Sequence, residues 1–275
     1  MGPPSCEVVV ASFNVHAGVD GWGRPFDVVE ACRSLSADVV VLQEAWSSPG
    51  GDDMAAGVAA ALGFSTVFRP LAGGRRALPA PSADRRWKPA RSWRGAHHAI
   101  YLDSERPLPR SVTGSARYRE AVPGRWGICV LSRHPLHDVT GIDLGRLPGD
   151  RVRRAVIVGR YEVGGRRLVV AGTHMSHLFF GSPAHFLRLR QVLGDLAGDD
   201  PAVLLGDMNL WGPAVAAFTG WRRAVRGRTW PAWRPHSQID HILVNGSVHT
   251  SEGRVCRVGR SDHLAVSARL TLAGP

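Results

Sequence analysis

The sequence predicts an α/β protein built from layered β-sheets, and two observations carry this prediction. Short apolar runs of strand length outnumber segments with helical spacing, and the helical segments fall between the strands. No internal repeat divides the 275 residues, so we expect a single domain, residues 1–275. A hydrophobic content of 44% is normal for a chain that buries a sizeable core, and it excludes an intrinsically disordered protein.

The first half of the chain contains two strand–helix pairs and then a proline-rich stretch. The predicted strands lie at residues 7–13 and 38–42, and the predicted helices at 26–35 and 51–62. The second helix begins with Asp52 and Asp53, whose carboxylates suit a helix N-terminus. Seven prolines and little periodicity predict that the basic stretch 69–125 is mostly loop around one strand at 98–102.

The second half of the chain returns to regular strand patterns. The predicted strands lie at residues 127–131, 155–163, 167–171, 202–205, 239–244 and 264–272. Gly164 and Gly165 separate two of these strands and predict a hairpin, because glycine accepts the positive φ of a tight turn. A helix is expected from Ser182 to about residue 196, with Ser182 as its N-cap and Pro183 in its first turn.

The net charge of +11 is concentrated in one part of the chain. Residues 69–125 hold 13 basic and four acidic residues, a net charge of +9, which leaves +2 for the rest. Lys88 is the only lysine, so the basic character comes almost entirely from arginine. The charge therefore marks an insertion in which to look for substrate binding, but it does not identify a reaction.

Three further features bear on cellular context. No apolar run is long enough to span a bilayer, and the first residues lack a basic region followed by an apolar stretch, which favours a cytoplasmic location. The four cysteines show no metal or redox spacing, so we expect reduced core thiols. No feature indicates an obligate protein partner.

Polar residues stand at the margins of predicted strands, all of them at a strand end next to a loop except Asp240, which lies early in the strand at 239–244. They are Asn14, Glu44, His174, Asp207, Asn209, Asp240, Asp262 and His263. Each alone has an ordinary explanation as a turn residue, a cap or a buried histidine. Because strand ends on one edge of a sheet can converge, the whole set is better explained as one site.

This set of side chains suits a specific chemistry. Carboxylate and amide oxygens without thiolates favour Mg²⁺ or Mn²⁺ over structural zinc. A histidine beside an aspartate suits a general base, and a second histidine can donate to a phosphate oxygen or a leaving group. Together these residues indicate metal-assisted hydrolysis of a phosphoester.

Seven short motifs in a fixed order resemble those of the endonuclease/exonuclease/phosphatase family. They are SFNVH at 12–16, VLQE at 41–44, LSRHP at 131–135, GTHMSH at 172–177, LGDMN at 205–209, QIDHIL at 238–243 and SDH at 261–263. The resemblance runs from about residue 8 to residue 272 and implies a four-layered α/β sandwich. In that fold two mixed sheets pack face to face, helices lie outside, and the active site lies at one end.

The resemblance also implies a metal site with Mg²⁺ as its expected ion. Glu44 would be the principal metal ligand, and Asn14 beside it would orient the metal or the phosphate. Asp262 would be a further ligand or a supporting carboxylate.

The remaining matched residues would handle water and protons. His263, paired with Asp240, would contact the phosphate or activate water. Asp207 would position the attacking water, and Asn209 would hydrogen-bond the phosphate. His174 is similar to the second catalytic histidine of the deoxyribonuclease and sphingomyelinase branch, where abasic-site enzymes have tyrosine. The acidic partner of His174 is not placed by the motifs, and Glu120 is one candidate.

The substrate is less closely defined. Arginines interleaved with tryptophans can neutralise phosphates and stack on bases, which favours nucleic acid. On this basis we predict Trp93 in the basic stretch, together with Arg222 and Arg223, as substrate-binding residues. A solvated arginine-rich loop whose tryptophans cover the edge of the sandwich explains the basic stretch equally well.

Two alternatives remain open. A phosphatase or phosphodiesterase acting on phospholipid or inositol-phosphate head groups would also use a basic surface, and the apolar segment 178–181 is the candidate for contact with a membrane. An inactive binding module that keeps the fold is disfavoured, because every matched catalytic position is filled.

Overall fold

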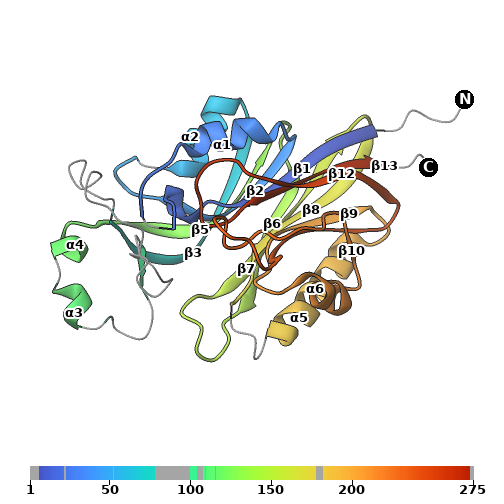
Figure 1. The fold of residues 1–275 in the computed structure, drawn as a ribbon. Coiled ribbons are helices and arrows are strands. Elements are labelled where there is room, and N and C mark those ends of the chain that lie inside the picture. Colours follow the sequence, from blue (N-terminus) through green and yellow to red (C-terminus); the bar gives the residue numbers. More distant parts are fainter. Residues whose placement is uncertain are drawn as a thin grey trace, which may run out of the picture.

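A computed structural model describes residues 6–21, 23–51, 53–77, 100–103, 108, 110–114, 116–177 and 182–272. It contains two mixed β-sheets that pack face to face, with helices on their outer surfaces (Figure 1). This arrangement confirms the predicted α/β sandwich. Within the described residues, no helix has the length and apolar character needed to cross a bilayer.

The first sheet has seven strands and the second has six. In spatial order the first sheet comprises β12 (Val248–Cys256), β13 (Ala265–Leu272), β1 (Cys6–Asn14), β2 (Val39–Ser47), β5 (Val122–Ser132), β3 (Ser65–Arg76) and β4 (Ile100–Leu102). The second comprises β10 (Arg222–Arg223), β11 (Asp240–Asn245), β9 (Ala202–Asp207), β8 (Arg166–His174), β7 (Arg154–Val163) and β6 (His137–Gly145). Within each sheet one pair of neighbours is parallel, β1 with β2 and β8 with β9.

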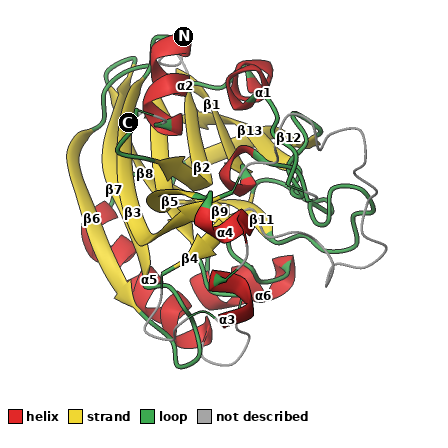
Figure 2. Cartoon of the chain, turned by 90° about the vertical axis from the view of Figure 1, so that its left-hand side faces the viewer, coloured by secondary structure: helices red, strands yellow, loops and turns green. Residues whose placement is uncertain are grey.

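Helices cover the outer face of each sheet, as Figures 1 and 2 show. On the first sheet, α1 (Val28–Leu35) and α2 (Met54–Leu62) pack against outward-facing residues of β1, β2 and β5. On the second, α5 (Ser182–Ala197) and α6 (Gly212–Thr219) do the same. The described elements also include a 3₁₀ turn at His16–Gly18 and two short helices, α3 (Arg110–Thr113) and α4 (Ala116–Arg119).

The period of two along each strand explains this layering. In β1, Val8 and Val10 face the core between the sheets, whereas Ala11 and Phe13 face the helices. The other central strands alternate in the same way. A polar residue placed in the inward phase at a strand end is therefore delivered to the space between the two sheets.

Local signals explain several element boundaries. The predicted helix at 51–62 begins at Met54, because the Oδ1 atom of Asp53 caps it by accepting the Ala56 N–H at 2.9 Å. The hairpin at Gly164–Gly165 is confirmed, with φ values of +55° and +71°. Helix α5 begins at Ser182 as predicted.

The prediction that residues 69–125 are mostly loop is wrong at both ends. Residues 69–76 continue the long strand β3, and residues 122–125 begin β5. In the sequence, Pro70 favours a loop. In the structure, the register of β3 with β5 shifts between Pro70 and Ala72, and a proline is tolerated at such a bulge. Of the expected strand at 98–102, residues 100–102 form β4, whereas most of the remaining insertion lies outside the described residues.

Candidate active site

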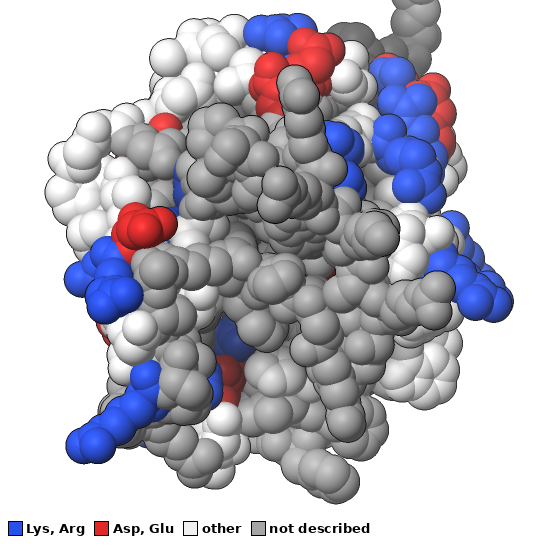
Figure 3. Space-filling model, turned by 60° about the vertical axis from the view of Figure 1, so that its left-hand side comes forward, with Lys and Arg blue, Asp and Glu red and all other residues white. Residues whose placement is uncertain are grey.

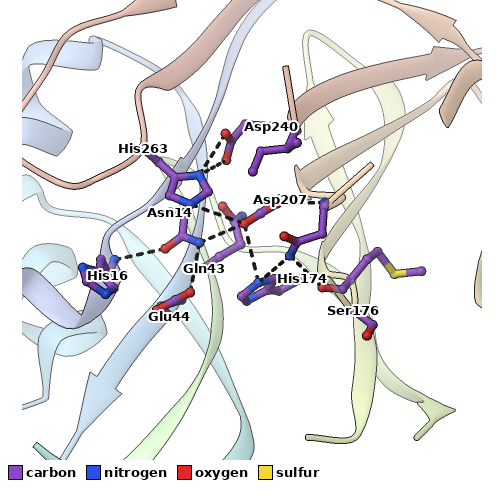
Figure 4. Close-up of polar contacts among 12 residues, drawn as sticks. Asn14, His16, Gln43, Glu44, His174, Ser176, Asp207, Asp240 and His263 are labelled. Carbon is purple, nitrogen blue, oxygen red and sulfur yellow. Dashed lines mark hydrogen bonds and ion pairs between the residues drawn. The ribbon is translucent and has the colours of Figure 1, made fainter. Parts of the chain in front are cut away.

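Strand ends from both sheets bring the polar residues together. Asn14 ends β1, His174 ends β8, Asp207 ends β9 and Asp240 begins the antiparallel strand β11 (Figure 4). In the second sheet Asp207 lies directly beside His174 on one neighbouring strand and Asp240 on the other. All four residues follow the inward phase of their strands, so they meet between the sheets.

Glu44 reaches this site through a distortion in β2. In a regular strand it would follow Val40 and Leu42 toward the helices. The pairing of β2 with β5 is instead irregular between Gln43 and Ala45, and Glu44 has a φ of +58°. The Nδ2 atom of Asn14 donates to the Oε1 atom of Glu44 at 3.2 Å, which places the carboxylate at the site.

Asp207 is the centre of the arrangement and is 1% exposed. Its Oδ2 atom accepts from Asn14 Nδ2 at 3.0 Å, and its Oδ1 atom accepts from the Asn209 backbone N–H at 2.9 Å. The same Oδ2 atom lies 3.6 Å from His174 Nε2 and 3.8 Å from His263 Nε2. Burial and the neighbouring Asp240 carboxylate raise the pKa of Asp207 to about 7.

His263 is held by Asp240. Its Nδ1 atom lies 3.0 and 3.1 Å from the two carboxylate oxygens of Asp240, so Nδ1 carries a proton and Nε2 faces Asp207. Burial lowers the pKa of His263, but the carboxylates of Asp240, Asp262 and Asp207 outweigh burial and hold that pKa well above its ordinary value. His263 is therefore cationic at neutral pH.

His174 lies in the opposite electrostatic environment. Burial lowers its pKa, and the positive charges of Arg154 and His263 lower it further, to well below the ordinary value. The Nδ2 atom of Asn209 donates to Met175 O at 3.0 Å and lies 3.2 Å from His174 Nε2. The His174 Nε2 atom is therefore the acceptor, and the proton sits on Nδ1, which has no hydrogen-bond partner among the described residues.

These contacts bear on two sequence predictions. Both amide hydrogens of Asn209 are directed at protein acceptors, so in this structure Asn209 orients His174. Its contact with a phosphate stays a prediction. Glu120, the candidate acidic partner of His174, is exposed in the turn after α4, and no carboxylate of the described residues hydrogen-bonds His174 Nδ1.

The oxygen ligands expected for a metal lie beside Asp207 and the two histidines. Glu44 is partly exposed in the cavity, and among the described residues no basic side chain comes within ion-pair distance of it. Asp262 lines the same cavity, its Oδ1 atom 3.6 Å from His16 Nδ1. Burial raises the pKa of Asp262, but His16 and His263 outweigh burial and lower it, so the carboxylate is ionised. Carboxylate and amide oxygens without thiolates fit Mg²⁺ or Mn²⁺.

A second group of possible ligand atoms is less suited to a metal. Asp207, Asp240 and His263 offer atoms that all lie within 4.8 Å of one another. The protonated Nδ1 atom of His263 is already bound to Asp240, however, and His263 is cationic. Binding of a cation between them would break that hydrogen bond, so these three residues fit a metal less well than Glu44 and Asp262 do.

A cavity of about 440 Å³ opens over these residues. Ile100, Leu102 and Trp126 form an apolar wall, and Arg151 and Arg154 form a basic one. The space-filling view shows the basic side chains of the described residues at several separate places on this side of the molecule (Figure 3).

One feature of the cavity wall was not anticipated from the sequence. Arg154 forms a buried ion pair with Asp150, with nitrogen–oxygen distances of 3.0 and 3.3 Å, and its guanidinium lies 6.0 Å from the centre of the Trp126 ring. Arg154 also donates to His174 O at 3.5 Å. The only sequence signal is an aspartate four residues before an arginine in an irregular segment, which does not indicate burial.

The predicted substrate-binding residues do not gather at this cavity. Arg222 and Arg223 form the two-residue edge strand β10, which pairs with Leu243 and Val244, away from the Asp240 end of β11. Neither residue lines the cavity, and Arg222 donates to Val248 O at 2.6 Å. Trp93 lies outside the described residues.

Comparison with known proteins places these residues in a family context. The model of the Endonuclease/Exonuclease/phosphatase family matches residues 11–263. The chain matches no curated protein.

Solved structures share the fold. An endonuclease/exonuclease/phosphatase from Beutenbergia cavernae DSM 12333 is 24% identical, with a TM-score of 0.64 over 98% of this chain and 72% of that one. The human Nocturnin catalytic domain is 15% identical, with a TM-score of 0.61 over 96% and 93%. The mannosyl-6-phosphatase Bt3783 of Bacteroides thetaiotaomicron VPI-5482 is 15% identical, with a TM-score of 0.58 over 96% and 99%. At these identities the likeness concerns the fold alone.

Proposed function

The chain belongs to the Endonuclease/Exonuclease/phosphatase family, whose members hydrolyse phosphoesters, and from this premise we propose that it is a divalent-metal-dependent phosphodiesterase acting on nucleic acid. One observation carries the proposal. Asp207 lies within 4 Å of a cationic and a neutral histidine, beside the Glu44 carboxylate. This arrangement supplies a proton acceptor, a positive charge for the phosphate and an oxygen ligand for a metal.

Glu44, Asp262 and the side chain of Asn14 would hold the cation, with Mg²⁺ as the expected ion and Mn²⁺ as a substitute. A bound cation would neutralise phosphate charge and favour attack at phosphorus. The fit rests on the oxygen-only donor set and on the absence of a basic partner for Glu44 among the described residues.

Asp207 is suited to orient and deprotonate the attacking water. A general base works best when its pKa is close to the working pH, and the pKa of Asp207 is raised to about 7. The Asn14 amide and the Asn209 backbone N–H fix both of its oxygens, so the carboxylate presents one orientation.

The two histidines would serve the charged oxygens of the substrate. His263, held in its protonated state by Asp240, would donate from Nε2 to a phosphate oxygen as negative charge develops. His174 would stay neutral beside Asp207, with its Nε2 atom 3.6 Å from the carboxylate. Asn209 would act by holding His174 in the tautomer with its proton on Nδ1.

The cavity supports nucleic acid over a lipid head group. Arg151 can contact phosphate, while Trp126, Ile100 and Leu102 give an apolar wall for a base or sugar. The apolar segment 178–181, on which a membrane-facing alternative depends, lies outside the described residues. Hydrolysis of phospholipid or inositol phosphate is the second candidate, because the basic wall of the cavity would also suit an anionic head group.

A substrate panel tests the proposal. Single-stranded DNA, double-stranded DNA, RNA, sphingomyelin and phosphoinositides are incubated with the protein in Mg²⁺, in Mn²⁺ or in EDTA. We expect cleavage of nucleic acid with metal only, and loss of cleavage in Glu44→Gln and His263→Ala. The matched controls Glu162→Gln and His249→Ala change exposed residues outside the cavity and should retain activity. Turnover of lipid alone would reject the nuclease assignment, and full activity of either site variant would reject the site.

A further inference from the structure

A second hollow shares His263 with the catalytic cavity. Its volume is about 280 Å³. Three arginines and one tryptophan shape it: Arg24, Arg257, Arg260 and Trp233. We call this hollow the arginine subsite. None of these four residues belongs to the group of Asp207, Asp240 and His263 or to the proposed metal ligands.

The charge of the arginine subsite comes from two of its arginines. Arg24 is neutralised by Asp20, whose Oδ2 atom lies 2.6 Å from Arg24 Nε. Arg257 and Arg260 are exposed, and within the described part of the chain neither makes an ion pair. Two uncompensated positive charges therefore face this hollow.

Both arginine heads are positioned by the backbone. One terminal nitrogen of Arg257 donates to Ala232 O at 2.8 Å, and one of Arg260 donates to Pro25 O at 3.0 Å. Each contact occupies one side of the planar guanidinium and leaves its other N–H groups available. A guanidinium held in this way loses less conformational entropy when it binds a phosphate.

Trp233 adds a stacking surface at the rim. It is 48% exposed, which is unusual for so large an apolar side chain. Its ring packs closely against Gly21, where an added Cβ would approach a ring carbon to 2.7 Å, so the backbone fixes the position of the indole. Arginines beside an exposed aromatic ring bind the phosphate and the base of a flexible strand.

We propose that the arginine subsite binds the phosphate and base of a nucleotide adjoining the scissile phosphodiester, so that the substrate is a nucleic acid strand and not an isolated phosphoester. This inference rests on the proposed function, because it takes the scissile bond to lie at the Asp207 cavity. The strand would pass over His263, which lines both hollows.

The test compares a strand with a small diester. Wild-type protein and the double variant Arg257→Gln/Arg260→Gln are assayed with a single-stranded DNA 12-mer and with bis(p-nitrophenyl) phosphate, which has no second phosphate for the arginines to bind. The matched control is Arg166→Gln/Arg167→Gln, which removes the same charge at the start of β8, at the opposite end of the strand from His174. Glutamine removes the positive charge but keeps a polar side chain that can donate a hydrogen bond, and thermal melting verifies the fold of each variant.

We expect the subsite variant to raise KM for the 12-mer at least tenfold while kcat/KM for the small diester changes less than twofold. The slope of log(1/KM) against log[salt] should become shallower by about 1.4, the value for two lost phosphate contacts on a single strand. A Trp233→Leu variant should raise KM for the 12-mer by a smaller factor without changing the salt slope.

Three results would overturn the inference: an unchanged KM for the 12-mer, an equal loss on both substrates, or the same loss in the control variant. Weaker binding to anionic phosphatidylserine vesicles with an unaffected 12-mer would also overturn it and assign the arginines to a membrane. If the wild-type protein hydrolyses neither diester, the proposed function fails instead, and the two failures are distinguishable.

Discussion

The two histidines of the site lie on opposite sides of one carboxylate and are tuned in opposite directions. His174 and His263 are both buried, and their Nε2 atoms lie 3.6 and 3.8 Å from the same oxygen of Asp207. Burial alone would lower the pKa of both. The pKa of His263 is nevertheless raised well above the ordinary value, whereas that of His174 falls well below it.

The neighbours explain the difference. His263 faces the carboxylates of Asp240 and Asp262 as well as Asp207. His174 has the Arg154 guanidinium behind it and an amide, Asn209, as its hydrogen-bond partner. One histidine is thereby held as a cation and the other as a neutral imidazole, although their burial and their distances to Asp207 are nearly equal. The charge of the neighbouring side chains, and not burial, therefore decides which of the two histidines is protonated.

The largest effect should follow from removing the support of the cationic histidine. Asp240→Asn leaves an amide in place of the carboxylate that holds His263 Nδ1, so we expect kcat to fall on the order of 10³-fold. The control Asp199→Asn, at an exposed position, should leave kcat unchanged. A folded Asp240→Asn protein with wild-type kcat would show that His263 does not need its partner.

The buried ion pair between Asp150 and Arg154 lies beside the neutral His174, and a substitution can break it. Arg154→Met leaves Asp150 buried without its partner, and we expect a loss of about 3 kcal/mol of unfolding free energy. The double variant Asp150→Asn/Arg154→Met removes the stranded charge and should recover part of the loss. Denaturant melts at pH 7 measure both values. A double variant no more stable than the single one would argue against the ion pair as the cause.

The strand-end residues of the site and the Asp150–Arg154 ion pair differ in how far the sequence could predict them. Asn14, His174 and Asp207 end strands and Asp240 begins one, and these strands are apolar runs in the sequence, so the convergence of the four residues was predictable. Asp150 and Arg154 belong to the connection into β7 and its first residue, where no periodicity indicates burial. The environment that makes His174 neutral is therefore a tertiary property.

The strands of the fold also differ in how well the sequence predicts them. The central strands were predicted because both faces are buried and their sequences are continuously apolar. Strands β6 and β12 were missed, because they lie at sheet edges and carry polar, exposed residues. The positive φ of Glu44 was equally invisible, since nothing in VLQE specifies a bulge.

A smaller effect concerns the carboxylate shared by the two histidines. The pKa of Asp207 is about 7 in the folded protein and 3.8 in the reference state, so the folded state binds the proton more tightly. The resulting stability is complete below about pH 4 and is lost as the pH rises through about 7.

The variant Asp207→Asn lacks this titration. In EDTA, its stability relative to the wild type should improve by about 2 kcal/mol between pH 5 and pH 8, whatever its offset at pH 5. Denaturant melts across this range measure the change. A flat difference across the range would mean that Asp207 does not titrate between pH 5 and pH 8, and it would contradict a base whose pKa is tuned to neutral pH.

The most direct test of the division of roles is the protonation state of the two histidines. Nitrogen-15 spectra of the histidine rings are recorded from pH 5.5 to 8.5 in EDTA, with His174→Gln and His263→Gln used to assign the two signals. We predict that His263 is doubly protonated at pH 7.5, and that His174 is neutral at pH 6 with its proton on Nδ1. Two histidines that both titrate near pH 6.5 would contradict the account.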